Sequence, residues 1–294
     1  MTESAAERQD PTPLKGGEKL LLAATICWST SGLFVRMIPT GAILMNALRS
    51  LIALPMVLLF KKSKWRWNWV ILLGGLCIAL TNNLYFLSLS MTTVGNAIVL
   101  QYMAPIFVLA ATCVQNRRVP RPMQIAVVAL GFAGVAFVFG GDLFGASDTT
   151  AFFGNCLALA SGVTFAGVFF INKLPGASPL DSTVMGFAFN LLPGLFFLSM
   201  LPGIGVYGWL ALAGLGVIQH GAAYIFFSRG IPRCSGFSAS LIGMLEVLLA
   251  PLWVWLVFGE QVTPAMLIGG GMILLAVLLN TLTERPVQKK QGIE

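Results

Sequence analysis

The chain has 294 residues, of which 57% are hydrophobic and 10% charged, and its formal net charge is +7. This composition, with a mean hydropathy of +0.85, is typical of a membrane protein and excludes an ordinary soluble domain. The positive charge comes from short basic stretches beside apolar runs, so it gives no reason to expect binding to RNA or DNA.

The chain opens with a polar, proline-containing stretch, residues 1–17, which lacks the basic region, apolar core and cleavage site of a signal peptide. We expect a disordered cytoplasmic tail. Apolar runs of about 20 residues follow, long enough to cross about 30 Å of hydrocarbon, and they lack the alternation of membrane strands. The ten predicted spans are 19–38, 42–60, 69–89, 94–115, 122–140, 152–172, 182–201, 207–228, 234–258 and 264–283. The pattern predicts an all-α polytopic membrane protein.

Basic residues occupy every second connection between the predicted spans. These connections and the two tails contain Lys15, Lys19, Lys61, Lys62, Lys64, Arg66, Arg117, Arg118, Arg121, Lys173, Arg229, Arg233, Arg285, Lys289 and Lys290. The alternate connections carry Asp142, Asp148 and Glu260, with Arg36 as their one basic residue. Because Lys and Arg accumulate on cytoplasmic loops, both termini are predicted to be cytoplasmic, which requires an even number of spans.

Two stretches align without a gap, residues 84–97 with residues 226–239, and each contains a helix end, a hinge and a helix that opens on small residues. The same offset places Ala104 and Pro105 against Glu246 and Val247. We therefore expect two five-helix repeats, 18–141 and 152–283, joined by an exterior linker at 142–151 and followed by a cytoplasmic tail at 284–294. An odd number of spans per repeat inverts the second copy and places a central cavity between the two.

Glu246 is the one carboxylate deep inside a predicted span. An ionisable group at that depth is costly and is by default a functional-site hypothesis. Glu246 is a counter-charge for a substrate amine, a protonatable coupling site, or a neutral residue bonded to a neighbouring helix, and the functional interpretations are favoured. Counting inward from the span ends places several polar and aromatic residues at the same depth, about 14 to 21 Å. The candidate cavity-lining residues are Trp28, Asn82, Asn83, Tyr85, Gln101, Tyr102, His220, Tyr224 and Glu246. Such a cavity suits a small amphipathic substrate.

Several of these residues also have a structural interpretation. In this interpretation the amides tie helices together and Trp28 is a packing residue. For His220, a neutral histidine bonded to a helix is favoured over a proton switch. For Arg49 a structural role is favoured, in which the side chain snorkels outward or pairs with a carboxylate. Pro105 and Pro251 interrupt helical hydrogen bonding and are either gate pivots or static kinks.

No motif points to an enzyme, a metal or a cofactor. The five cysteines fall in predicted spans without metal-ligand spacing, so neither a zinc site nor a disulfide framework is expected. Residues 203–208 match a dinucleotide-binding fingerprint as a string, but no strand precedes them. A nucleophile elbow, an HExxH motif and a P-loop are all absent from the sequence.

Short motifs along the chain resemble the drug/metabolite transporter superfamily. The matching residues are Trp28-Ser29, Leu48-Arg49, Ala53, the hexapeptide 100–105, Leu245-Glu246 and Gly259-Glu260. The chain is similar to the EamA branch and, within it, to YddG-type exporters of aromatic amino acids. Two residues depart from the family pattern, namely Val247, where proline is usual, and Arg118, where glutamate is usual.

The resemblance implies a secondary transporter, independent of ATP, in a bacterial inner membrane. The favoured activity is export of aromatic and other apolar amino acids by alternating access. Efflux of organic cations or drugs, with Glu246 as the counter-charge, is the alternative, and a membrane receptor or scaffold is a more remote one. Expected partners are a small-molecule substrate and the lipid bilayer, without nucleic acid, and a monomer is compatible with the sequence.

Overall fold

The computed structural model describes residues 16–61, 64–138, 149–200, 203–259 and 263–283. Asp142, Asp148 and Glu260, most of the predicted exterior linker and nearly all of both predicted tails lie outside these residues. The described chain is helical throughout, with no strand. Its elements are α1 (Gly16–Ser29), α2 (Ser31–Val35), α3 (Ala42–Phe60), α4 (Trp69–Leu89), α5 (Val94–Gln101), α6 (Ala104–Gln115), α7 (Pro122–Val138), α8 (Thr149–Ile171), α9 (Pro179–Leu195), η1 (Leu198–Met200), α10 (Val206–Gly214), η2 (Leu215–Ala222), α11 (Ala223–Gly230), η3 (Ile231–Arg233), α12 (Gly236–Gly243), α13 (Leu245–Phe258) and α14 (Pro264–Thr283).

Within the described residues, seven helical stretches are long and apolar enough to cross a bilayer. They are 42–60, 69–89, 94–115, 149–171, 206–233, 236–258 and 264–283. The other three predicted spans coincide with shorter helices, namely α1 with α2, α7, and α9. The predicted all-helical membrane fold is confirmed by these elements, while the count of ten spans stays a prediction.

Several helices begin where the sequence supplies a capping side chain. The Asn68 side chain accepts a hydrogen bond from the Ile71 amide at 2.9 Å. Thr93 caps α5 and Ser235 caps α12 in the same way, at 3.1 and 3.0 Å. Such oxygens satisfy amides that have no partner within the helix. Thr93 and Ser235 are also related by the offset of the aligned stretches, so the repeat extends to the capping residues.

The predicted span 182–201 differs from the observed helix, because α9 begins at Pro179 and ends at Leu195. Proline is favoured in the first helical turn. Asp181, which precedes the predicted span, therefore lies in the first turn of α9 and not in a loop. Its carboxylate is buried against Lys61, whose Nζ lies 2.8 Å from Asp181 Oδ1. A charge that is unfavourable for a membrane helix is thus accommodated by a partner on α3.

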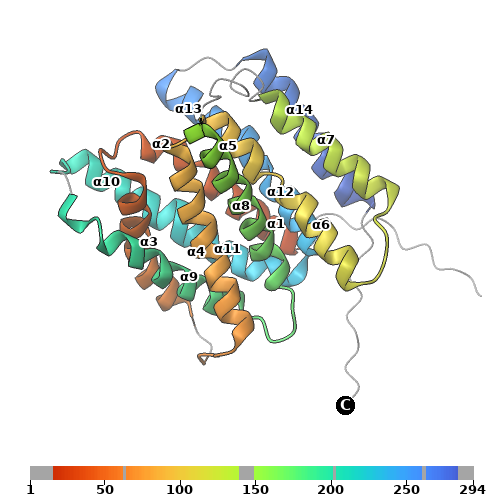
Figure 1. Ribbon diagram of the computed structural model, residues 1–294, viewed down its shortest axis with the longest axis horizontal. Coiled ribbons are helices and arrows are strands. Elements are labelled where there is room, and N and C mark those ends of the chain that lie inside the picture. Colours follow the sequence, from red (N-terminus) through yellow and green to blue (C-terminus); the bar gives the residue numbers. More distant parts are fainter. Residues whose placement is uncertain (1–15, 62–63, 139–148, 201–202, 260–262, 284–294) are drawn as a thin grey trace, which may run out of the picture.

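Helices α7 and α14 lie side by side along one edge of the molecule (Figure 1). A methyl group on Gly134 would come within 2.6 Å of the Gly269 carbonyl oxygen, and one on Gly269 would overlap the Gly134 carbonyl oxygen. Gly131 faces Ala276, so the two helices run antiparallel. Small residues allow membrane helices to approach this closely.

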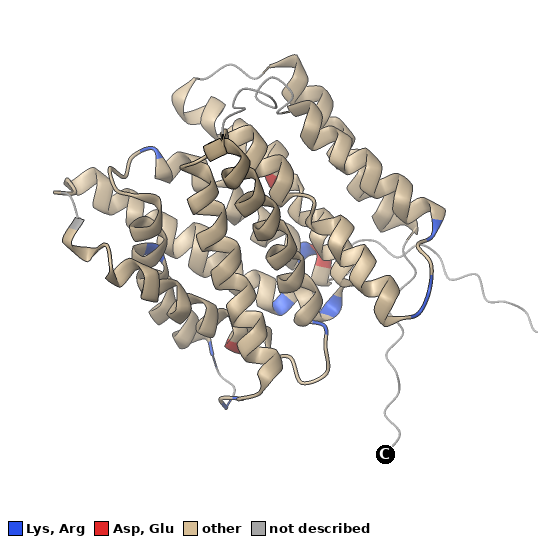
Figure 2. Cartoon of the chain, viewed as in Figure 1, with Lys and Arg blue, Asp and Glu red and all other residues tan. Residues whose placement is uncertain are grey.

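The helix ends on the side where α1 begins are packed tightly together. Gly17 on α1 contacts Gly230 at the end of α11. Lys173 Nζ donates to the carbonyl oxygens of Ile231 and Pro232, both at 3.2 Å. Figure 2 shows that most described Lys and Arg residues lie toward this side, at the bottom of the view, while the helix middles are largely uncharged.

Candidate functional site

A cavity of about 510 Å³ lies among the helices of both halves of the chain. Residues from α1, α2, α3, α4, α5, α8, η2, α11, α13 and α14 line it. Its volume is in the range of small-molecule sites. The polar and aromatic lining residues include Trp28, Arg49, Thr81, Asn82, Tyr85, Phe86, Gln101, Tyr102, Phe165, Gln219, His220, Tyr224 and Glu246.

The cavity extends toward the helix ends opposite the start of α1. Arg36, which follows α2, lines it together with Leu89 at the end of α4 and Val94 at the start of α5. Val254 and Met266, near the connection between α13 and α14, complete this part of the lining. The site is therefore asymmetric, because the lining reaches one end of the helix bundle while the other end is closed by side-chain contacts.

A break between α5 and α6 presents Gln101 and Tyr102 to the cavity. Helix α5 ends at Gln101 and α6 begins at Ala104, with Pro105 in its first turn. Gly162 on α8 packs against this break, where a methyl group would come within 2.7 Å of the Leu100 carbonyl oxygen. Proline at the helix start needs no amide partner, so Pro105 is accommodated where α6 begins.

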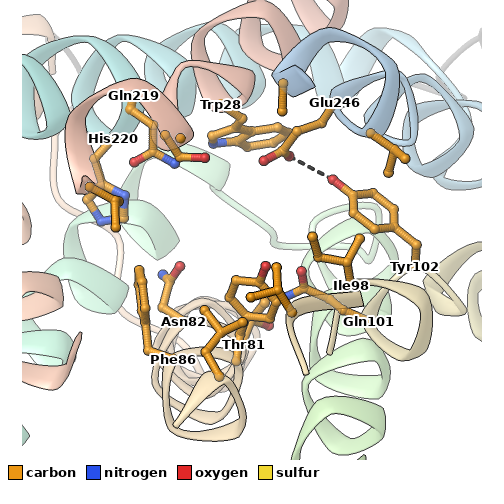
Figure 3. Close-up of a pocket in the computed structure, with 18 of the residues that line it drawn as sticks. Trp28, Thr81, Asn82, Phe86, Ile98, Gln101, Tyr102, Gln219, His220 and Glu246 are labelled. Carbon is orange, nitrogen blue, oxygen red and sulfur yellow. Dashed lines mark hydrogen bonds between the residues drawn. The ribbon is translucent and has the colours of Figure 1, made fainter. Parts of the chain in front are cut away.

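A matching break at Met244 separates α12 from α13 and places Glu246 in the first turn of α13. The break forms without a proline after Glu246, so the departure at Val247 does not prevent it. A carboxylate is favourable near a helix N-terminus. Tyr102 also donates its hydroxyl hydrogen to Glu246 Oε2 at 2.8 Å, which joins the two breaks along one side of the cavity (Figure 3).

Arg49 does not snorkel, and it pairs with no carboxylate of the described residues, so neither route expected from the sequence is observed. Its side chain is 3% exposed and lines the cavity from α3. Nε donates to Asn46 at 3.0 Å, Nη1 to Gln219 at 2.9 Å and Nη2 to Asn82 at 3.0 Å. The Phe86 ring lies 4.6 Å from its guanidinium carbon. Neutral amides and an aromatic ring, rather than an anion, hold this cation.

Asn83 does not line the cavity, unlike its neighbour Asn82. Its amide joins a chain of hydrogen bonds behind the cavity wall, accepting from Asn46 at 3.2 Å and donating to Asn190 at 2.9 Å. Asn190 in turn donates to Ser50 Oγ at 3.1 Å. For Asn83 the helix-tying interpretation therefore describes the observed contacts.

His220 lines the cavity and is also fixed from behind. Its ring stacks on Phe187 with centroids 4.1 Å apart, and Nε2 lies 3.1 Å from Ser50 Oγ. The Ser50 hydroxyl donates to the Asn46 carbonyl oxygen at 2.8 Å. Nε2–H must therefore be the donor to Ser50, which assigns the tautomer of the imidazole.

Replacing Ser50 with alanine is expected to lower the free energy of unfolding by about 2 kcal/mol. The change leaves the amide of Asn190 and Nε2–H of His220 without their buried acceptor. Thermal unfolding of the purified protein in detergent measures this loss. Ser90→Ala is the matched control, because Ser90 has an exposed hydroxyl contact to the Leu87 carbonyl oxygen. Equal stability of the two variants would contradict a buried polar chain.

Aromatic side chains close the cavity toward the end where α1 begins. The centroid of the Trp28 ring lies 5.5 Å from that of Tyr224, 5.7 Å from that of Phe227 and 6.4 Å from that of Phe165. Phe169 and Phe227 behind it are fully buried. Trp28 therefore both packs and lines the cavity, so the packing and binding interpretations apply to the same residue.

The two candidate pivots differ in their placement. Pro251 lies inside α13 and lines the cavity, whereas Pro105 is buried in α6 and does not line it. In the described part of the chain, no three His, Cys, Asp or Glu residues gather as a metal site would require.

The sequence interpretation missed Gln219, Thr81, Phe86 and Phe165 as lining residues. Gln219 had a usable signal, because it is a polar residue beside His220 in the same apolar run. The apolar aromatics had none, since phenylalanine is frequent throughout the chain.

Comparisons with known proteins agree with the family that the sequence motifs resemble. The model of the EamA-like transporter family matches residues 15–140 and again 152–282. An "Uncharacterized transporter" of Archaeoglobus fulgidus is 29% identical over 90% of this chain and 96% of its own. The "Uncharacterized transporter YwfM" of Bacillus subtilis is 25% identical over 88% and 91%. A crystal structure with 18% identity matches with a TM-score of 0.76, covering 90% of this chain and 96% of that chain, which supports the fold alone.

Proposed function

Because the chain belongs to the EamA-like transporter family, we propose that it is a secondary transporter that moves small metabolites by alternating access. The observation that carries this proposal is the cavity of about 510 Å³, whose lining reaches one end of the helix bundle only. Alternating access requires such a site between two halves that rock about it. Energy comes from gradients of substrate or ions.

Contacts between corresponding helices support an inverted arrangement of the two halves. Under the offset that pairs residue 84 with residue 226, Gly134 corresponds to Ala276 and Gly131 to Ile273. Gly134 contacts Ile273, and Gly131 contacts Ala276. The contacts are therefore reciprocal, as they are at a twofold axis, and the helices that make them are antiparallel. Together with α1–α2, α7 and α9 as short spans, this gives ten spans.

The distribution of charge supports an orientation with both termini in the cytoplasm. Lys and Arg lie mostly at the end where α1 begins (Figure 2), which is the cytoplasmic end by the positive-inside rule. The cavity then faces the exterior. For a bacterial inner membrane, this is the state from which an exporter releases its substrate.

Aromatic and other apolar amino acids fit the cavity best. Trp28, Tyr224 and Phe165 offer an apolar surface for a side chain, and Glu246 with Tyr102 offers an acceptor for an ammonium group. Uptake of radiolabelled phenylalanine into proteoliposomes tests this substrate. We expect flux that depends on the protein and saturates, and empty liposomes are the control. Absence of both binding and flux for aromatic amino acids would overturn the proposed substrate.

Efflux of organic cations is a second candidate, supported by the presence of Glu246 beside aromatic rings in the cavity. In that case Glu246→Gln abolishes transport of quaternary amines, and Tyr102→Phe weakens it less. Unchanged cation transport by Glu246→Gln would remove this candidate. Binding of ligands without flux in the same vesicles would instead favour a receptor.

A further inference from the structure

We propose that Arg49 binds the carboxylate of a zwitterionic substrate whose ammonium group faces Glu246, so that the cavity selects ligands carrying both charges. The inference rests on the proposed transport function and adds to it the residue that reads the carboxylate. Arg49 is a buried cation. Among the described residues, no carboxylate lies within ion-pair distance of the Arg49 guanidinium.

The guanidinium retains N–H donors that its three amide partners do not use. Arginine has five N–H groups, one on Nε and two on each terminal nitrogen. Asn46 accepts from Nε, Gln219 from Nη1 and Asn82 from Nη2. One N–H on each terminal nitrogen thus has no acceptor in the described part of the protein. Two such donors are what a carboxylate needs for bidentate binding.

The orientation of Arg49 is fixed before a ligand arrives. Asn46, which holds Nε, is itself held by Asn83, and Asn83 by Asn190. The Phe86 ring lies against the guanidinium. A side chain held in this way loses little freedom on binding, which is the condition for a selective site.

Glu246, whose charge is opposite to that of Arg49, lines another part of the same cavity. Figure 3 shows Gln219, a partner of Arg49, on one side of the cavity beside His220, and Glu246 with Tyr102 on the other. Arg49 and Glu246 therefore do not neutralise each other by contact. A cation alone is repelled by Arg49, and an anion alone by Glu246. A molecule with an ammonium and a carboxylate group compensates both charges.

The aromatic residues lie beside these two charges and complete the recognition. Trp28 and Tyr224 form the wall toward the closed end. An α-amino acid presents its two charged groups from one carbon and leaves its side chain to a third surface. This arrangement agrees with one Arg, one Glu and an aromatic wall around a single cavity.

Competition for phenylalanine binding in nanodiscs tests the proposal, with three probes of similar shape. Phenylalanine carries both charges, phenethylamine lacks the carboxylate, and 3-phenylpropionate lacks the ammonium group. We expect phenylalanine to bind about 10- to 100-fold more tightly than either analogue, in line with a charge-assisted bidentate contact. Equal binding of phenylalanine and phenethylamine by the unmodified protein overturns the inference while the proposed transport function stands.

Two substitutions are expected to change the preference of the cavity among the three probes. Arg49→Gln is expected to lose about 10- to 100-fold in phenylalanine binding and to bind phenethylamine more tightly than the parent protein does. Glu246→Gln is expected to gain affinity for 3-phenylpropionate. Arg121→Gln, at the exposed start of α7, is the control. Phenylalanine binding that survives Arg49→Gln overturns the inference. If that variant does not fold, the three-probe comparison on the unmodified protein decides alone.

Discussion

Replacing Asp181 with asparagine is expected to open the closed end of the transporter. The Lys61–Asp181 pair joins the end of α3 to the start of α9, and the two side chains are 3% and 1% exposed. Ser178 also donates to Asp181 Oδ2 at 2.6 Å. Removing one member of a buried pair leaves an uncompensated charge, which costs about 3–5 kcal/mol.

That cost falls on the conformation in which the pair is buried. A protein that exchanges between two conformations then shifts by about 100-fold or more toward the other one. Labelling of a cysteine at position 228 by a membrane-impermeant maleimide reports the shift, because Ser228 contacts Thr183 at 3.1 Å within the closed end. The parent for this experiment is a variant in which the five cysteines are replaced.

The control substitution is Lys64→Gln, because Lys64 is an exposed lysine in the same connection. Exchanging the charges in Lys61→Asp with Asp181→Lys is expected to restore part of the protection. Labelling of Asp181→Asn at the parent rate would show that the pair does not bias the two conformations.

Leucine at Gly269 is expected to destabilise the protein by at least about 3 kcal/mol, whereas leucine at Gly271 is tolerated. A methyl group at Gly269 would already overlap the Gly134 carbonyl oxygen, and backbone atoms cannot move aside as side chains do. At Gly271 no atom of the described residues lies within 4 Å of such a group. Replacing a glycine inside a helix also stabilises the helix there, by about 0.5–1 kcal/mol, because glycine is a poor helix former.

Unfolding midpoints of the two variants in detergent measure this difference. The residues are two positions apart on α14, so helix propensity is closely matched, and they differ in that Gly269 is buried whereas Gly271 is exposed. A similar loss of stability for both leucines would mean that contact with α7 does not set the tolerance of α14.

Positions along the helices could be predicted from the sequence, whereas directions around them could not. The helix starts at Trp69, Val94 and Pro264 follow from local signals, namely capping side chains and proline. Depth follows from counting residues at about 1.5 Å each. Asn82 and Asn83 share a depth, but consecutive helical residues point about 100° apart. Only packing decides which of the two faces the cavity.

Contacts between distant parts of the chain explain the other misses. The predicted span 182–201 excluded Asp181, because the lysine that accommodates its charge, Lys61, is far away in sequence. The environment of Arg49 depends on Asn82 and Gln219, which lie on two other helices. No local pattern marks three amides as the partners of one arginine.

The wall that carries Gln219 and His220 is wound as a π-helix over Leu215–Ala222. In such a segment each backbone amide bonds five residues back instead of four, and turns of this kind occur often at functional sites. The wider turn changes the direction in which its side chains leave the helix axis. Gln219 and His220, which both line the cavity, therefore point where an unbroken α-helix from α10 to α11 would not place them.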